Sequence, residues 1–328
     1  EGTLANTNIT WEKTTAKNIG LDVAFLKNKL TISGDYYIRD TKGILLQLNQ
    51  PAILGASPPV VNAGAVRNRG FEIIAGYKDR IGKVGYYVNA NFSKVKNEIT
   101  DLAGTEYPGR ELGDPIDNLF GLEAEGLFQN QNEIDKHPDQ SAIGIPKPGD
   151  IMYKDINGDG KVDNKDRKNL GSYFPAINYG FSYGVDYRGF DISMLWQGVA
   201  QVKASLDGRL AQPFGDYGSS PIEAQLDRWT PDGKNPNARF PRESFSASYN
   251  YVESSWWIVN TSFLKLRNVQ IGYTLPASLL QKIKVSKVRV YVSGENLITI
   301  SPFKIMDPES LTSGDPFFGY SGYTAYPT

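Results

Sequence analysis

Apolar and polar residues alternate strictly in several stretches of this chain, and a period of two is typical of β-strands with one apolar and one polar face. In residues 18–25, for example, Ile, Leu, Val and Phe occupy the odd positions. The same alternation occurs in residues 29–39, 71–78, 83–93, 177–197 and 287–296. The pattern therefore predicts an all-β fold.

The connections between these stretches are alternately short and long. Short connections lie near residues 27, 80 and 188, and a somewhat longer one, residues 276–287, has room for one helical turn. The long connections span roughly residues 40–66, 97–176, 200–260 and 300–328. Soluble domains rarely contain loops longer than about 15 residues, whereas outer-membrane barrels combine short periplasmic turns with long extracellular loops. We therefore expect a transmembrane antiparallel β-barrel, because each stretch also has about the length of a tilted membrane-crossing strand.

One stretch, residues 262–276, changes phase in the middle. Leu264 and Leu266 share one face, but Val269 and Ile271 fall on the other face unless one residue bulges out of the strand. A β-bulge near residues 267–268 would restore the register. Alternatively, the first half of this stretch has already left the membrane.

The direction of successive strands predicts where the longest connection belongs. The strand near residues 83–95 follows a short turn and should end outside the cell, and the strand at 177–187 should start there. An even number of crossings must separate them, and only residues 118–129 offer a candidate. We therefore expect that residues 118–129 do not cross the membrane and that residues 97–176 form one extracellular segment.

About eight crossing strands are predicted, and the chain ends inside a predicted loop. A barrel has no free strand edges. We therefore expect this chain to be a fragment that lacks a final strand and whatever precedes residue 1.

Composition and charge narrow the classes of function. The 35 basic and 36 acidic residues nearly cancel, so no nucleic-acid partner is expected. There is no cysteine and only one histidine, His137, which leaves little basis for a zinc site or a Ser-His-Asp triad. The sequence has no apolar run of about 18 residues, so no transmembrane helix is expected. The 19 tyrosines and 33 glycines suit a barrel with aromatic girdles.

Six segments carry a resemblance to a known family. They are TWEKTTAKNIGLDVAFLKNKLTISGDYY, RNRGFEI, PGDIMYKDINGDGKVDNKDR, NYGFSYGVDYRGFDISMLWQG, SFLKLRNVQIGYTLP and VRVYVSGENLITIS. In this order they resemble the C-terminal part of the SusC/RagA-type TonB-dependent outer-membrane transporters of Bacteroidetes. The resemblance spans nearly the whole chain and implies the C-terminal strands of a 22-stranded barrel.

The resemblance also implies partners. It implies an N-terminal plug and TonB box outside this chain, and a SusD-like surface lipoprotein that covers the barrel and captures oligosaccharides or peptides. Uptake would be driven through TonB. The chain departs from the family pattern because it lacks the terminal strand, which usually ends in an aromatic residue.

Residues 155–166 follow the ligand order of an EF-type calcium loop. Such a loop takes oxygen ligands from positions 1, 3, 5, 7, 9 and 12 and has glycine at position 6. Here these ligands fall on Asp155, Asn157, Asp159, Lys161 (through its carbonyl), Asp163 and Asp166, with Gly160 sixth. Because the preceding segment contains Pro and Gly, we expect a free-standing structural calcium loop. The alternative is a solvated turn, since Asn, Asp and Gly favour turns without metal.

Four further features of the sequence bear on function. Trp256 and Trp257 are expected in an outer aromatic girdle. The alternative is that they stack on sugar rings. Trp229 is expected in a loop, where it either packs or contacts substrate, and His137 is expected to be exposed. The acidic side chains that could form a glycosidase pair have nothing that positions them; they are Asp117, Glu123 and Glu125. We therefore do not expect an enzyme.

The leading hypothesis is SusC-like, TonB-dependent import of oligosaccharides or peptides by a barrel embedded in outer-membrane lipid. The rival hypothesis is a calcium-stabilised, surface-attached all-β binding module without transport activity. The two differ in solubility, because the apolar faces of a barrel must contact lipid or detergent.

Overall fold

The computed structural model describes residues 6–47, 59–104, 109–214, 220–244, 248–280 and 284–312. The chain divides into two compact units. The first unit consists of Glu1–Thr105, Pro175–Gln201 and Ser262–Pro302, and the second of Glu106–Phe174, Val202–Thr261 and Phe303–Thr328. Most of the predicted long connections thus form a unit of their own.

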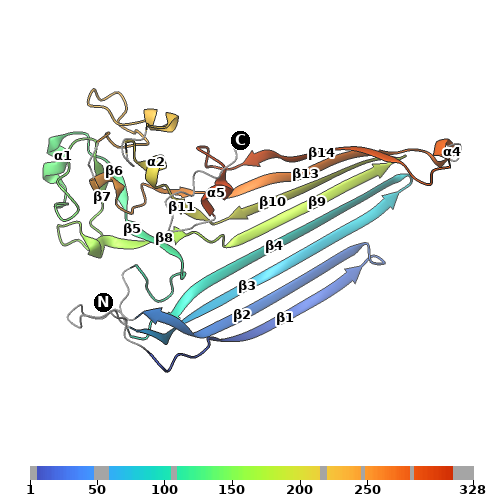
Figure 1. Cartoon of the computed structure of the whole chain (residues 1–328), viewed down its shortest axis with the longest axis horizontal. Coiled ribbons are helices and arrows are strands. Elements are labelled where there is room, and N and C mark those ends of the chain that lie inside the picture. Colours follow the sequence, from blue (N-terminus) through green and yellow to red (C-terminus); the bar gives the residue numbers. More distant parts are fainter. Residues whose placement is uncertain are drawn as a thin grey trace. The chain divides into compact units, whose positions relative to one another are not determined.

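The first unit is one antiparallel sheet of eight strands, which lie side by side in Figure 1. The strand order follows the chain, because each strand pairs with the next one that belongs to the sheet. The strands are β1 (Lys13–Phe25), β2 (Leu30–Gln47), β3 (Val60–Ile81), β4 (Val84–Asp101), β9 (Ile177–Tyr187), β10 (Phe190–Ala200), β13 (Phe263–Thr274) and β14 (Arg289–Ile300). This confirms the predicted all-β class and the predicted number of strands.

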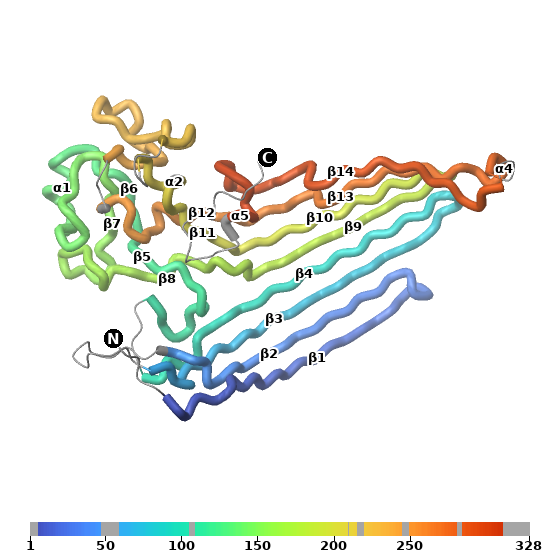
Figure 2. Tube along the Cα trace, viewed as in Figure 1, coloured from blue at the N-terminus to red at the C-terminus, as the bar shows by residue number. Residues whose placement is uncertain are grey.

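Short turns join the strands in pairs at one end of the sheet (Figure 2). Between β9 and β10 the turn is Arg188–Gly189, with φ angles of 50° and 92°. Positive φ at both central residues is what a tight hairpin turn between twisted strands requires. The connection from β13 to β14 contains the predicted helical turn, α4 (Ala277–Leu280).

The strands reach further than the predicted loop boundaries near residues 40–66 and 97–176. β2 continues to Gln47, β3 starts at Val60 and β4 continues to Asp101. The register between β2 and β3 shifts near Ile44, and that between β3 and β4 shifts near Val66. Such irregularities break the side-chain period of two while backbone pairing continues. Residues 48–58, in the middle of the first predicted loop, and residues 313–328 of the last lie outside the described residues.

The predicted bulge in residues 262–276 is confirmed. Along β13, the pairing with both neighbours skips Arg267: Trp196 of β10 lies opposite Leu266, and the next pair is Leu195 with Asn268. The extra residue brings Leu264 and Leu266 onto the face that carries Val269 and Ile271. The whole of β13 therefore belongs to the sheet.

Residues 118–129 lie outside the large sheet, because β4 pairs directly with β9, and this agrees with the prediction that they do not cross the membrane. In the second unit, β5 (Asn118–Leu122) pairs with β8 (Arg167–Ser172), and β6 (Ala124–Leu127) pairs with β7 (Ile151–Tyr153). The other elements of this unit are short. They are α1 (Gln131–Lys136), η2 (Asn164–Asp166), β11 (Lys203–Ser205), α2 (Gly208–Ala211), η3 (Glu223–Leu226), η4 (Ser248–Tyr251), β12 (Ile258–Asn260) and α5 (Pro308–Thr312).

The second unit has its own hydrophobic core, and this core contains the three tryptophans that the sequence left in loops or girdles. Trp229 is 8% exposed and Trp257 is 2% exposed, and Trp256 packs against the same cluster. The girdle prediction for Trp256 and Trp257 was wrong, because both pack in this core and the strand that follows them, β12, pairs with β11 in a separate two-stranded sheet. No helix in the described part of the chain is long and apolar enough to cross a membrane.

Candidate functional site

The eight-stranded sheet has two chemically different faces. One cross-strand row is apolar in every strand: Val23, Ile32, Ala75, Ala90, Phe181, Trp196, Leu266 and Ile298. Many large side chains of this face are exposed; for example, Val292 is 76% and Ile271 is 56% exposed. Contiguous apolar surface of this extent requires an apolar environment, as the outward face of a membrane barrel does.

The opposite face is polar. The neighbouring row consists of Asp22, Ser33, Ile74, Asn91, Gly180, Gln197, Lys265 and Thr299. Only one of these eight side chains is a large aliphatic one. A polar face of this kind is what the inside of a transmembrane barrel presents.

Near the short turns, the polar face carries two aspartates that lie opposite each other, Asp186 on β9 and Asp191 on β10. Like charges in directly opposed positions destabilise a sheet. Arg80 Nη2 donates to both carboxylate oxygens of Asp186, at 3.0 and 2.8 Å. Arg289 Nε donates to Asp191 Oδ1 at 3.1 Å. Each aspartate is therefore neutralised by an arginine from a strand beyond its neighbour.

A glycine under each of these ion pairs provides the space for it. Gly85 lies opposite Asp186, and Gly272 lies opposite Asp191. A Cβ atom at either glycine would come within 2.5 Å of the Nη2 atom of the arginine that crosses it. The glycines thus allow the arginine side chains to reach across a strand.

The predicted calcium loop, residues 155–166, lies in the second unit between β7 and β8, and its last three residues form the short helix η2. Its carboxylates accept hydrogen bonds from the loop's own backbone. The Asp155 oxygens accept from Gly158 and Gly160 at 2.7 and 2.8 Å, and Asp159 Oδ1 accepts from Lys161 at 3.0 Å. Gly160 has a φ of 83°, in the left-handed region that its position requires. As predicted, the segment directly before this loop is not helical; it is the strand β7.

Asp166, the twelfth residue of the loop, is fully buried. Its Oδ1 accepts from the backbone N–H groups of Ile156 and Asn157 at 2.8 and 3.2 Å, and its Oδ2 accepts from Asp163 at 2.8 Å. Burial opposes ionisation, but these backbone donors and the side chain of Asp155 outweigh it and lower the pKa of Asp166. Asp166 therefore closes the loop as a charged group.

The donor set of the loop suits calcium chemically, because it consists of carboxylate, amide and carbonyl oxygens. Among the residues that the structure describes, however, no group of three or more His, Asp or Glu side chains is arranged to hold a metal ion. Metal binding by Asp155, Asn157, Asp159, Lys161, Asp163 and Asp166 therefore stays a prediction.

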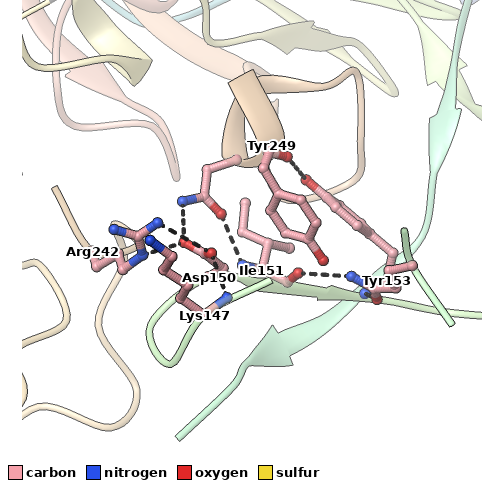
Figure 3. A network of polar contacts seen from close by, with 8 residues as sticks. Lys147, Asp150, Ile151, Tyr153, Arg242 and Tyr249 are labelled. Carbon is pink, nitrogen blue, oxygen red and sulfur yellow. Dashed lines mark hydrogen bonds and ion pairs between the residues drawn. The ribbon is translucent and has the colours of Figure 1, made fainter. Parts of the chain in front are cut away.

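A polar network anchors the segment before the loop to a distant part of the same unit (Figure 3). Asp150 is fully buried and accepts from Arg242 Nε at 2.6 Å, from Asn250 Nδ2 at 2.8 Å and from the backbone N–H of Lys147 at 2.8 Å. Asn250 in turn accepts from the backbone N–H of Ile151 at 2.9 Å. The partners lie 92 and 100 residues apart in sequence, so local spacing gave no signal for this network.

Two tyrosines extend the network into the core. The Tyr153 hydroxyl donates to the backbone oxygen of Tyr249 at 3.2 Å, and the backbone N–H of Tyr153 donates to Gln140 Oε1 at 2.7 Å (Figure 3). Burial raises the pKa of both tyrosine hydroxyl groups. Both hydroxyl groups therefore remain neutral, and the two rings pack with centroids 5.9 Å apart.

Two further residues of the sequence analysis, Glu123 and His137, have structural partners. The Glu123 carboxylate lies 2.6 Å from Lys168 Nζ and 3.8 Å from Lys154 Nζ. The prediction that His137 is exposed was wrong: its side chain is 9% exposed, and its ring packs edge-on against Phe128 with centroids 5.2 Å apart. Phe128 lies nine positions before His137 in the sequence, so the turn-like composition around His137 did not indicate this contact.

Comparisons with known proteins agree with the two-faced sheet. The family model "TonB dependent receptor-like, beta-barrel" matches residues 1–297. The chain is 29% identical over 324 residues to TonB-dependent receptor P3 of Formosa agariphila, covering 93% of this chain and 31% of that protein. It is 27% identical over 320 residues to TonB-dependent receptor SusC of Bacteroides thetaiotaomicron, covering 93% of this chain and 30% of that protein.

Among solved structures, the chain is similar to one described as the RagAB peptide transporter. The TM-score is 0.74 with 23% sequence identity, and the match covers 94% of this chain and 34% of the other. At this identity the match supports the fold. The chain spans about a third of the length of the relatives it matches.

An antiparallel sheet with one lipid-compatible face and one polar face is typical of transmembrane β-barrels. Together with the relatives, it assigns the chain to the β-barrel proteins of the outer membrane. The chain belongs to the TonB-dependent receptor-like β-barrel family. Its relatives are named as receptors and transporters rather than enzymes. The family decides between the two hypotheses in favour of the outer-membrane barrel.

Proposed function

We propose that the protein to which this chain belongs imports oligosaccharides or peptides across the outer membrane by TonB-dependent transport. The observation that carries the proposal is the sheet itself, with an apolar row and a polar row that each run through all eight strands. The names of the relatives also support import, since one relative is named SusC and one similar structure is described as a peptide transporter. In this proposal the polar face lines the path of the cargo.

The second unit lies on the extracellular side in this proposal, because short turns are periplasmic in outer-membrane barrels and long excursions are extracellular. A SusD-like lipoprotein covers the barrel there and delivers cargo. TonB acts through an N-terminal region outside this chain. The protein has no catalytic role in this scheme. The ion pair of Glu123 with Lys168 Nζ at 2.6 Å supports this, because Glu123 is one of the candidate acids.

The test is uptake of labelled oligosaccharides and labelled peptides by cells that express the complete transporter. Matched cells lack either the transporter or functional TonB. We expect uptake of one cargo class that disappears in both deletions. Uptake that is unchanged without TonB would contradict the energised mechanism, and equal uptake without the transporter would contradict the assignment of transport to this protein.

The lipoprotein partner is tested separately. The complete transporter is co-expressed with a SusD-like lipoprotein from the same genome, and the two are purified through a tag on the transporter. We expect a stoichiometric complex that survives size-exclusion chromatography in detergent. Complete separation of the two proteins would remove the partner from the proposal without affecting transport.

Calcium is proposed as a structural ion of the 155–166 loop. The order of oxygen-bearing residues supports it, and extracellular sites bind calcium with dissociation constants of about 10⁻⁴ to 10⁻³ M. Isothermal titration of the complete transporter with calcium, compared with the Asp155→Ala/Asp159→Ala variant, tests it. We expect binding heat only in the unsubstituted protein; identical heats would leave the loop as a metal-free turn.

A further inference from the structure

The guanidinium group of Arg239, in the second unit, is surrounded by aromatic rings. Its Cζ atom lies 5.6 Å from the ring centroid of Phe240, 5.9 Å from that of Trp256 and 5.7 Å from that of Trp257. A guanidinium within about 6 Å of a ring face is attracted to it electrostatically. The three rings therefore fix the position of this cation.

Unlike its neighbours, Arg239 has no acidic partner. Three other partly buried arginines of the unit each pair with a carboxylate: Arg167 with Glu253 at 3.0 Å, Arg228 with Glu243 at 3.2 Å and Arg242 with Asp150 at 2.6 Å. With the residues that the structure describes, Arg239 forms ring contacts but neither a hydrogen bond nor an ion pair. Its donors are therefore available to a ligand.

A second donor of the same cluster also has no acceptor. The indole Nε1 of Trp256 is buried and makes no hydrogen bond within the described part of the chain. The other two indoles of the unit do have acceptors: Trp229 donates to Gln129 at 3.1 Å, and Trp257 donates to the backbone oxygen of Asn250 at 2.6 Å. The Trp256 ring centroid lies 5.9 Å from Arg239 Cζ. Buried polar groups nearly always have a partner, so unpaired donors on these two contacting residues indicate an acceptor from outside the described residues.

The electrostatics of the cluster agree with this view. Burial lowers the pKa of Arg239, and Coulomb attraction from Asp227 opposes that shift only in part. The Asp227 carboxylate already accepts from Asn235 Nδ2 at 2.7 Å. A desolvated guanidinium without a paired anion is unfavourable, and an incoming anion would relieve this cost.

We propose that Arg239, together with the indole N–H of Trp256, binds a carboxylate. A guanidinium carries its N–H groups in a planar fork that matches a carboxylate. The apolar surroundings strengthen such a charge-assisted bond. A sugar acid and the C-terminus of a short peptide offer the same group. The site is independent of transport, because it concerns binding alone.

The test is a fluorescence titration of the complete transporter in detergent. The probes are sodium acetate, sodium glucuronate and diglycine, with glucose as the neutral control. We expect a saturable change in tryptophan emission with the carboxylates and none with glucose. Tighter binding of glucuronate than of diglycine supports a sugar-acid ligand, and the reverse order supports a peptide ligand.

Variants assign the response to this cluster. Arg239→Gln should weaken apparent affinity by about tenfold or more, since hydrogen bonds to charged groups are strong. Trp256→Phe should weaken it severalfold and reduce the fluorescence change. Arg110→Gln, at an exposed arginine, should leave the affinity unchanged.

Three results would overturn the proposal: no saturable response in the unsubstituted protein, an equal response to glucose, or unchanged affinity in Arg239→Gln. If the glutamine variant loses the near-ultraviolet circular dichroism of the unsubstituted protein, Arg239→Lys decides instead. Lysine retains the charge over the rings but lacks the planar fork. Its affinity should fall by about threefold or more, and full affinity would contradict a forked contact.

Discussion

Two buried carboxylates, Asp150 and Asp166, hold the second unit together by accepting several hydrogen bonds each. Asp150 joins the end of a turn to Arg242 and Asn250, far along the chain. Asp166 joins the two ends of the 155–166 loop through three backbone donors. A substitution that removes either carboxylate leaves its buried donors without acceptors, which lowers the free energy of unfolding by about 1 to 3 kcal/mol.

Asp150→Asn should therefore destabilise the second unit by about 1 to 3 kcal/mol. The substitution keeps one oxygen acceptor but removes the charge that faces Arg242. Because Arg242 is 25% exposed, solvent offsets part of the loss. Hydrogen exchange of residues 147–153 in the intact protein measures the effect. Glu253→Gln is the control: it removes a carboxylate that is 76% exposed, so a change of similar size there would contradict the argument.

The 155–166 loop should loosen in acid. The pKa of Asp166 lies below its ordinary value of 3.8, so the charged carboxylate stabilises the folded loop. That stabilisation is fully present above the unfolded pKa and is lost as the pH falls through the lower folded value. Hydrogen exchange of the loop from about pH 5 to about pH 3 should show this loss.

Asp166→Asn separates this effect from general acid unfolding. It should expose the loop to trypsin at neutral pH and abolish the acid-dependent change there. Asp163→Asn is the matched control, because asparagine also caps the start of a short helix. Equal protease resistance of both variants would contradict a special role for Asp166.

Among the strands, β13 shows how a single residue can preserve the two faces of a sheet. Without the bulge at Arg267, Leu264 and Leu266 would face away from Val269 and Ile271. A one-residue slip moves every following side chain to the other face. Arg267 is held at the bulge by bonds to Gln197 at 3.0 Å and to Asn296 at 3.1 Å.

Deletion of Arg267 should be tolerated, because it removes the extra residue and leaves the apolar side chains of β13 on one face. Deletion of Gln270 should not be tolerated, because it separates the two halves of the apolar face. Heat-modifiable mobility in gel electrophoresis reports whether the barrel forms. Loss of the folded band in both deletions, or in neither, would show that the bulge does not set the register.

For the molecule as a whole, the apolar face of the sheet has to meet lipid and the polar face has to avoid it. Ala90 and Asn91 are neighbours on β4, and they belong to the apolar and the polar row. A charge on the lipid face near the middle of the bilayer costs about 2 to 4 kcal/mol. The same charge on the inner face remains solvated.

Ala90→Lys should therefore lower the stability of the barrel in lipid vesicles by about 2 to 4 kcal/mol, while Asn91→Lys should change it little. Denaturant unfolding of the complete transporter in vesicles measures both. The reverse ranking would mean that the two faces have been assigned to the wrong environments.

Much of the sheet could be predicted from the sequence, and the reason is local. Successive side chains of a strand point to opposite faces. The alternation of apolar and polar residues from Val288 to Val292 therefore shows directly which side chains face the apolar environment. The alternation predicted the number of strands and the bulge near Arg267, and the direction of successive strands excluded residues 118–129. It failed where bulges near Ile44 and Val66 interrupted the period, so the strand ends were placed too early.

The second unit was decided by tertiary structure. Its strands are three to six residues long, which is too short for a periodic pattern. Its core and polar network join residues about a hundred positions apart, as Asp150 and Asn250 are. The order of side chains therefore determined the two faces of the membrane sheet, because that property repeats every second residue. The burial of Trp257, the pairing of Asp150 and the open donors around Arg239 depended on contacts between distant segments, which only folding brings together.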